Sequence, residues 1–155
     1  MTLTLLVDVD GTLLFNDEDQ FQKLYFRLLG ETLHPWVSAE RLKAAVIEAG
    51  KRSMEKDTPV NTMEECFDQA FYSRLGIDKA EIGDAIEKFF ATTFPRLGST
   101  TRPIPGARKL IETAFNRGWD VVVATNPLLP SITTLQRLEW AQIPVSEFPY
   151  RLVTS

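Results

Sequence analysis

The stretch Leu3–Asp19 reads LTLLVDVDGTLLFNDED, an apolar run broken by two aspartates, a glycine and a threonine. Residues 3–7 are apolar or β-branched on both faces, which is typical of a parallel strand that is covered on both sides. The end of this strand has two interpretations. It is either an ordinary turn or the place where a strand delivers paired carboxylates to a reaction site.

The composition indicates a folded domain of moderate size. The chain has 155 residues, of which 44% are hydrophobic, so it can bury a core as one domain with an insertion. A net charge of −4 argues against nucleic acid as a partner, because a polyanion is usually bound by a basic face. The single cysteine, Cys66, cannot form an internal disulfide. There is neither a signal peptide nor an apolar run long enough for a membrane span, so we expect a cytoplasmic protein without membrane contact.

Helical patterns follow the first strand. We expect four short helices, which begin near Asn16, Ser38, Thr62 and Asp78. The first three are expected to end at Gly30, Gly50 and Gly76, since glycine commonly follows the last turn of a helix. Four helices joined by short turns predict a small helical bundle.

The pattern changes after Pro95–Gly106, a polar stretch with three prolines that we interpret as a linker. Helices and strands alternate beyond it, and the clearest strand is the buried segment DVVVATN at residues 120–126. The chain therefore predicts an α/β fold with a doubly wound, Rossmann-like parallel sheet. Its core is expected to comprise residues 1–13 and 100–155, interrupted by an all-helical insertion at residues 14–99.

Polar side chains stand where two of the predicted strands end. Asp8 and Asp10 are two residues apart, so their side chains project to the same side of an extended strand, and Gly11 allows a sharp bend after them. Thr125 and Asn126 end the later buried strand. Ligands bind beyond the carboxyl ends of parallel strands, so these side chains share one crevice if the two strands are neighbours.

These residue types suit phosphoryl transfer. One carboxylate can attack phosphorus while the other gives a proton to the leaving oxygen. A hydroxyl and an amide can hold the equatorial oxygens of the transferring group. Carboxylate oxygens also favour a hard cation such as Mg²⁺, which offsets the charge between nucleophile and phosphate.

The motif DVDGT at residues 8–12, followed after a helical insertion by VVVATN at residues 121–126, resembles the haloacid dehalogenase (HAD) superfamily of phosphotransferases. The resemblance implies that Asp8 is the nucleophile that becomes an aspartyl phosphate. It implies that Asp10 is the general acid and then the base for water, and that both residues hold Mg²⁺, Asp10 through its backbone carbonyl. The true dehalogenases lack an acid two residues after the nucleophile, so Asp10 favours the phosphatase branch.

The same resemblance assigns the rest of the site. It implies that Thr125 binds the phosphate through its hydroxyl, with Asn126 and Gly11 beside it, and that the helical insertion is a cap over the site. The substrate would be a small phosphorylated metabolite. A Mg²⁺-dependent phosphatase of small organic phosphomonoesters is the leading interpretation, with a sugar-phosphate mutase and a non-catalytic binding or regulatory module as alternatives.

The family's third and fourth motifs, a lysine and then a strand end with one or two acids, have no counterpart in this sequence. No lysine follows Lys109, and the only acids after Asp120 are Glu139 and Glu147. We therefore expect a truncated chain, incomplete on the carboxy-terminal side of its core and impaired as a catalyst. Residues 3–7 would then form an apolar edge that pairs with a missing carboxy-terminal segment or with a second copy in a dimer.

Simpler structural interpretations of the site residues remain open. Asp8 and Asp10 can belong to a strand followed by a turn. Thr125 and Asn126 can cap a helix or shape a turn before Pro127.

Overall fold

The computed structural model describes residues 3–55, 62–126 and 129–154, which form two compact units. The core unit comprises residues 1–21 and 95–155, and the helical unit residues 22–94. The described strands are β1 (Thr4–Val7), β2 (Leu14–Asn16), β3 (Thr101–Pro103), β4 (Asp120–Val123) and β5 (Leu152–Val153). The described helices are α1 (Glu18–Leu33), α2 (Ala39–Met54), α3 (Met63–Leu75), α4 (Lys79–Lys88), α5 (Ala107–Asn116) and α6 (Ser131–Trp140), with a π-helical turn at Phe89–Thr93 and a 3-10 helix at Phe94–Thr100. None of the helices in these ranges is long and apolar enough to cross a membrane.

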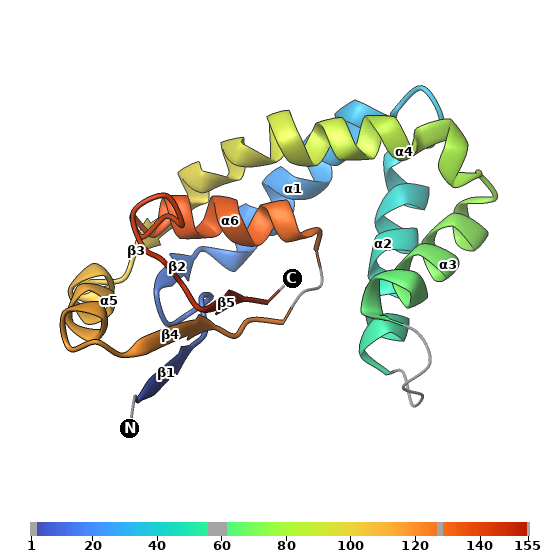
Figure 1. Cartoon of the computed structure of the whole chain (residues 1–155). Coiled ribbons are helices and arrows are strands. Elements are labelled where there is room, and N and C mark those ends of the chain that lie inside the picture. Colours follow the sequence, from blue (N-terminus) through green and yellow to red (C-terminus); the bar gives the residue numbers. More distant parts are fainter. Residues whose placement is uncertain (1–2, 56–61, 127–128, 155) are drawn as a thin grey trace. The chain divides into compact units, whose positions relative to one another are not determined.

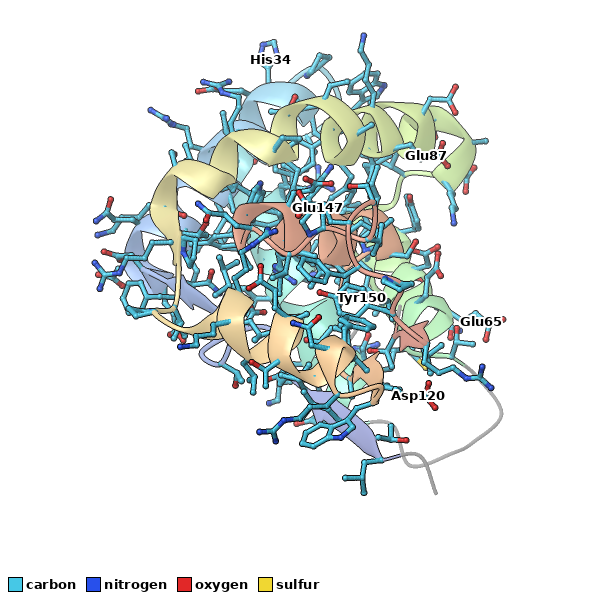
Figure 2. All side chains as sticks on the ribbon, turned by 60° about the vertical axis from the view of Figure 1, so that its left-hand side comes forward. His34, Glu65, Glu87, Asp120, Glu147 and Tyr150 are labelled. Carbon is cyan, nitrogen blue, oxygen red and sulfur yellow. The ribbon has the colours of Figure 1, made fainter. Side chains whose placement is uncertain are left out.

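A parallel sheet organises the core unit. Its strands run in the order β1-β4-β5, and Figure 1 shows them side by side. Thr4 pairs with Asp120, which is labelled in Figure 2 at the amino end of β4, and Val7 pairs with Val123 at the carboxyl end. The N–H of Ala124 donates to the carbonyl of Val7 at 2.9 Å and so extends the pairing one residue beyond β4. The predicted α/β fold is confirmed, and so is the adjacency of the two strands that precede the polar residues.

One face of this sheet carries the hydrophobic core. Val7, Val121 and Val123 are buried in the same cluster as Ile111 of α5 and Leu138 of α6. Side chains alternate between the two faces of a strand, so these valines point to one side. Both helices therefore cover the same face of the sheet.

The opposite face is open within the described residues, so the prediction that the first strand is covered on both sides is wrong for this part of the chain. Leu6, Val122 and Leu152 are register partners across the three strands, and Leu6 is 66% and Leu152 56% exposed. β1 pairs with β4 on one side and with no other described strand. The apolar edge that the sequence predicts at residues 3–7 is thus present in the described part of the chain.

The Pro-rich stretch Pro95–Gly106 is not a free linker. It contains most of the 3-10 helix and the strand β3, which pairs with β2 in an antiparallel ribbon that sets Pro103 opposite Leu14. Leu14 and Leu97 are fully buried, and this burial orders a segment whose composition alone indicates a linker. The predicted boundaries of the insertion, after residues 13 and 99, stay a prediction.

The helix starts in the helical unit follow local capping signals. The hydroxyl of Ser38 accepts from the N–H of Arg41 at 3.4 Å at the start of α2. Thr62 and Glu65 form the reciprocal capping box of α3, with distances of 3.1 and 2.7 Å. Gly76 ends α3 in the left-handed region with φ of 64°. These three predictions are confirmed.

The predicted ends of the first two helices are wrong. α1 continues through Gly30 to Leu33, and α2 continues through Gly50 to Met54. A Cβ atom at Gly30 would lie 3.6 Å from the Cβ of Ala39, so this glycine sits where two helices approach closely. Glycine inside a helix costs about 1 kcal/mol, which tertiary packing readily overrides.

Gly98 provides a test of packing in the core unit. A Cβ atom there would lie 2.8 Å from Nε1 of Trp140, closer than real Cβ contacts. We expect Gly98→Ala to lower the free energy of unfolding by about 1–3 kcal/mol, as overpacking does. Gly50→Ala is the control, because its Cβ would meet nothing within 4 Å, and it should stabilise α2 by about 0.5–1 kcal/mol. Urea unfolding followed by circular dichroism measures both, and equal effects of the two changes would contradict the packing argument.

The open sheet face provides a second test. An apolar row beside an unpaired strand edge promotes association between copies of a chain. We expect Leu6→Lys to reduce the concentration-dependent association of this chain in analytical ultracentrifugation. Leu110→Lys replaces a leucine on α5 that is also exposed but lies away from this sheet face, and it should leave association unchanged. Wild-type protein that stays monomeric at high concentration would count against the edge as a contact.

Candidate active site

The two predicted acids lie directly after β1. Asp8 is exposed, and its carboxylate accepts a hydrogen bond from the N–H of Val9 at 2.8 Å. Asp10 is half-buried. Gly11 follows with φ of 74°, a left-handed conformation that favours glycine, and its N–H donates to the carbonyl of Leu14 at 2.8 Å. The chain therefore bends sharply after the acids, as the sequence predicts.

Thr125 and Asn126 lie just beyond β4, the neighbour of β1. Thr125 is half-buried and Asn126 is exposed. Thr154, which follows β5, fixes the backbone of Thr125: its hydroxyl accepts from the Thr125 N–H at 2.9 Å and donates to the Thr125 carbonyl at 2.8 Å. The N–H of Thr154 also donates to the carbonyl of Val123 at 2.9 Å. The three strand ends are thus tied together at one edge.

This arrangement brings the predicted polar residues to the same edge of the sheet. Asp8 and Asp10 follow the carboxyl end of β1, and Thr125 and Asn126 follow that of β4, which runs parallel to it. Such an edge is where open α/β sheets bind ligands. The chemical roles of these residues stay predictions, and Pro127, on which the alternative turn interpretation depends, lies outside the described residues.

Asp10 has two partners that the sequence reasoning did not identify. Asn16, at the end of β2, donates from Nδ2 to one carboxylate oxygen of Asp10 at 2.7 Å. Arg137 of α6 places Nη1 3.7 Å from the other oxygen. A weak signal for Arg137 is its spacing from the buried Thr133 and Thr134, which sets all three on the inward side of the helix. No comparable signal singles out Asn16.

The carboxylates at this edge fit a hard cation. No group of three or more His, Cys, Asp and Glu residues that could hold a metal ion occurs among the described residues. Mg²⁺, however, is commonly held by one or two carboxylates together with waters and phosphate oxygens. The exposed carboxylate of Asp8 is accessible to such an ion, whereas both carboxylate oxygens of Asp10 have protein partners. Asp8 would therefore bind such an ion through its side chain, and a metal contact through the Asp10 backbone carbonyl is what the family resemblance implies.

Comparison with known proteins identifies the fold. No protein-family model and no curated protein matches the sequence. Among solved structures, a HAD phosphatase from Thermococcus onnurineus matches 99% of this chain and 61% of its own, with 18% identity and a TM-score of 0.50. A hydrolase from Pseudomonas syringae has 18% identity and a TM-score of 0.47, with 99% of this chain and 60% of its own covered. CbbY from Rhodobacter sphaeroides in complex with phosphate has 18% identity and a TM-score of 0.45, and the match covers 99% of this chain and 63% of the CbbY chain.

The match with the Thermococcus onnurineus structure carries a conclusion about architecture. The chain shares the fold of that HAD phosphatase, with a Rossmann-like core. It spans about three-fifths of the length of the solved structures that it matches.

The contact between Thr154 and Thr125 leads to a prediction about the strand ends. Thr154→Val keeps the shape of the side chain but leaves the Thr125 N–H without its acceptor. We expect it to lower the free energy of unfolding by about 1–2 kcal/mol, the usual cost of losing such hydrogen bonds. Thr154→Ser retains the hydroxyl, so its free energy of unfolding should lie within about 0.5 kcal/mol of the wild-type value. Urea unfolding measures the stability of both variants. Equal stability would show that the hydrogen bonds between Thr154 and Thr125 contribute nothing to the free energy of unfolding.

Proposed function

We propose that this chain supplies the nucleophile, the general acid and the phosphate-binding hydroxyl of a Mg²⁺-dependent phosphatase of small organic phosphomonoesters. The parallel pairing of β1 with β4 is the observation that carries the proposal, because two carboxylates and a hydroxyl follow neighbouring strand ends, where open α/β sheets generally bind ligands. The fold shared with a HAD phosphatase supports it.

In the first step, a carboxylate oxygen of Asp8 attacks the phosphorus of the substrate. A bond forms between that oxygen and phosphorus, and the bond from phosphorus to the alcohol oxygen breaks. Asp10, acting as a carboxylic acid, gives its proton to the departing oxygen, so the alcohol leaves uncharged. The exposure of the Asp8 side chain suits the in-line approach of a phosphate.

In the second step, water attacks the phosphorus of the aspartyl phosphate. Asp10, now a carboxylate, accepts a proton from this water, and the bond between phosphorus and the Asp8 oxygen breaks. Inorganic phosphate leaves, and both acids return to their starting protonation states. One pair of acids thus serves both halves of the reaction.

The remaining polar groups would hold the transferring phosphate. The Thr125 hydroxyl would donate to one equatorial oxygen, with the side-chain amide of Asn126 and the backbone at Gly11 beside it. Mg²⁺ held by Asp8 and Asp10 would supply positive charge that offsets the repulsion between the nucleophile and the phosphate. The two hydrogen bonds from Thr154 would keep Thr125 in position.

Asp8→Asn provides the decisive test. It removes the nucleophile while preserving the shape of the side chain, so turnover of phosphomonoesters in the presence of Mg²⁺ should fall by at least about 10³-fold. The matched control is Asp120→Asn, at the amino end of β4 and therefore at the other end of the sheet, which should keep turnover within about twofold. Released phosphate measures the activity.

Two further measurements separate the alternatives. Beryllium fluoride, a mimic of the aspartyl phosphate, should bind in the presence of Mg²⁺ and give a ¹⁹F NMR signal that is lost in Asp8→Asn and on addition of EDTA. If the wild type shows neither turnover nor this signal, the proposal is contradicted. The non-catalytic binding module is then the interpretation that remains. A hexose monophosphate that is isomerised without release of phosphate would instead indicate the mutase.

A further inference from the structure

We propose that Arg137, together with Asn16, is a positioning residue that fixes the orientation of the Asp10 carboxylate. The inference rests on the proposed function for its catalytic consequence, because it concerns the residue proposed as general acid. The geometry itself is independent of that function.

Both oxygens of the Asp10 carboxylate have a partner, one through a hydrogen bond and the other through an ion pair, and the two partners come from different elements. Asn16 Nδ2 donates to Oδ1 at 2.7 Å, and Arg137 Nη1 lies 3.7 Å from Oδ2. Asn16 is itself fixed at the end of β2, where it pairs with Thr101 of β3. Rotation of the carboxyl group about its last side-chain bond would break the Asn16 hydrogen bond and move Oδ2 away from the Arg137 guanidinium.

Arg137 is unusually enclosed for an arginine. Its side chain is 13% exposed, against 39% for that of Asp10, and its guanidinium lies 5.9 Å from the ring centre of Phe21. Its Nε atom is buried and has no hydrogen-bond partner among the described residues. The guanidinium is therefore confined by packing, and its charge lies beside Asp10.

This geometry is poorly suited to a purely stabilising role. A separation of 3.7 Å is too long for a hydrogen bond, and an ion pair whose carboxylate side chain is 39% exposed contributes little net stability. Proton transfer to a leaving oxygen, by contrast, depends steeply on where the acid points. The consequence of the arrangement is therefore expected in catalysis more than in folding.

NMR of the ¹⁵N-labelled full chain tests the arrangement without any need for turnover. In the wild type, the Asn16 side-chain amide should show a hydrogen-bonded proton, and the Arg137 Nη signals should be shifted by the neighbouring carboxylate. Asp10→Ala should shift both the Asn16 side-chain signals and the Arg137 Nη signals. Asp8→Ala, which removes the neighbouring acid, should leave both unchanged. Signals that do not respond to Asp10→Ala would overturn the proposal.

The catalytic arm compares two leaving groups. Arg137→Met should lower kcat/KM for an alkyl ester, glycerol phosphate, by about 10- to 100-fold, part of the ~10²–10⁴-fold that general acid–base catalysis supplies. For p-nitrophenyl phosphate, whose phenolate leaves with little help from an acid, the loss should stay within about threefold. Arg137→Lys should recover most of the lost alkyl-ester activity. Arg117→Met removes an arginine whose guanidinium lies 5.4 Å from the ring centre of Trp119, away from the acids. It should leave kcat/KM for both substrates unchanged.

The outcomes distinguish the two proposals. Equal losses on both substrates, or a clear drop in the urea midpoint of Arg137→Met, would make Arg137 a structural residue and overturn its positioning role. Should the wild type turn over neither substrate, the proposed function and the catalytic half of this inference both fail. The NMR arm then still decides whether Asn16 and Arg137 hold Asp10.

Discussion

The parallel pairing of β1 with β4 is the constraint on which the rest of the core unit depends. Parallel neighbours end at the same edge of a sheet, so residues far apart in the chain come together there. The register is secured by burial: a slip of one residue would move Val121 and Val123 from the core to the open face. The positions of Asp8 and Thr125 at one edge are thus consequences of where a few valines are buried.

Local signals in the sequence predicted the parts of the fold that local interactions determine. The caps at Ser38 and Thr62 need only neighbours three residues away, and both are present. Gly30 and Gly50 were misleading, because an interior glycine and a terminal one look alike until the packing of the surrounding turns is known. The β2–β3 ribbon escaped prediction because each strand has three residues and its partner lies in a distant segment.

The candidate site likewise combines residues that local sequence signals indicate with residues whose contacts depend on long-range packing. The positions of Asp8, Asp10 and Thr125 could be predicted because each stands at the end of an apolar strand, while their chemical roles stay predictions. Arg137 and Thr154 could not, since their contacts exist only once α6 and β5 have packed against the rest of the core. Sequence reasoning therefore found the groups proposed to react and missed those that hold them in place.

The distance along the chain between β1 and β4 has a consequence for folding. Contacts of high sequence separation form slowly, because a long loop must close before they form. During synthesis, β1 leaves the ribosome first but finds its partner only after the segment around Val123 has emerged. The helical unit is built from contacts closer in sequence and can fold in the interval. Throughout that interval, β1 is an apolar strand without its sheet partner, the kind of exposed segment that chaperones bind.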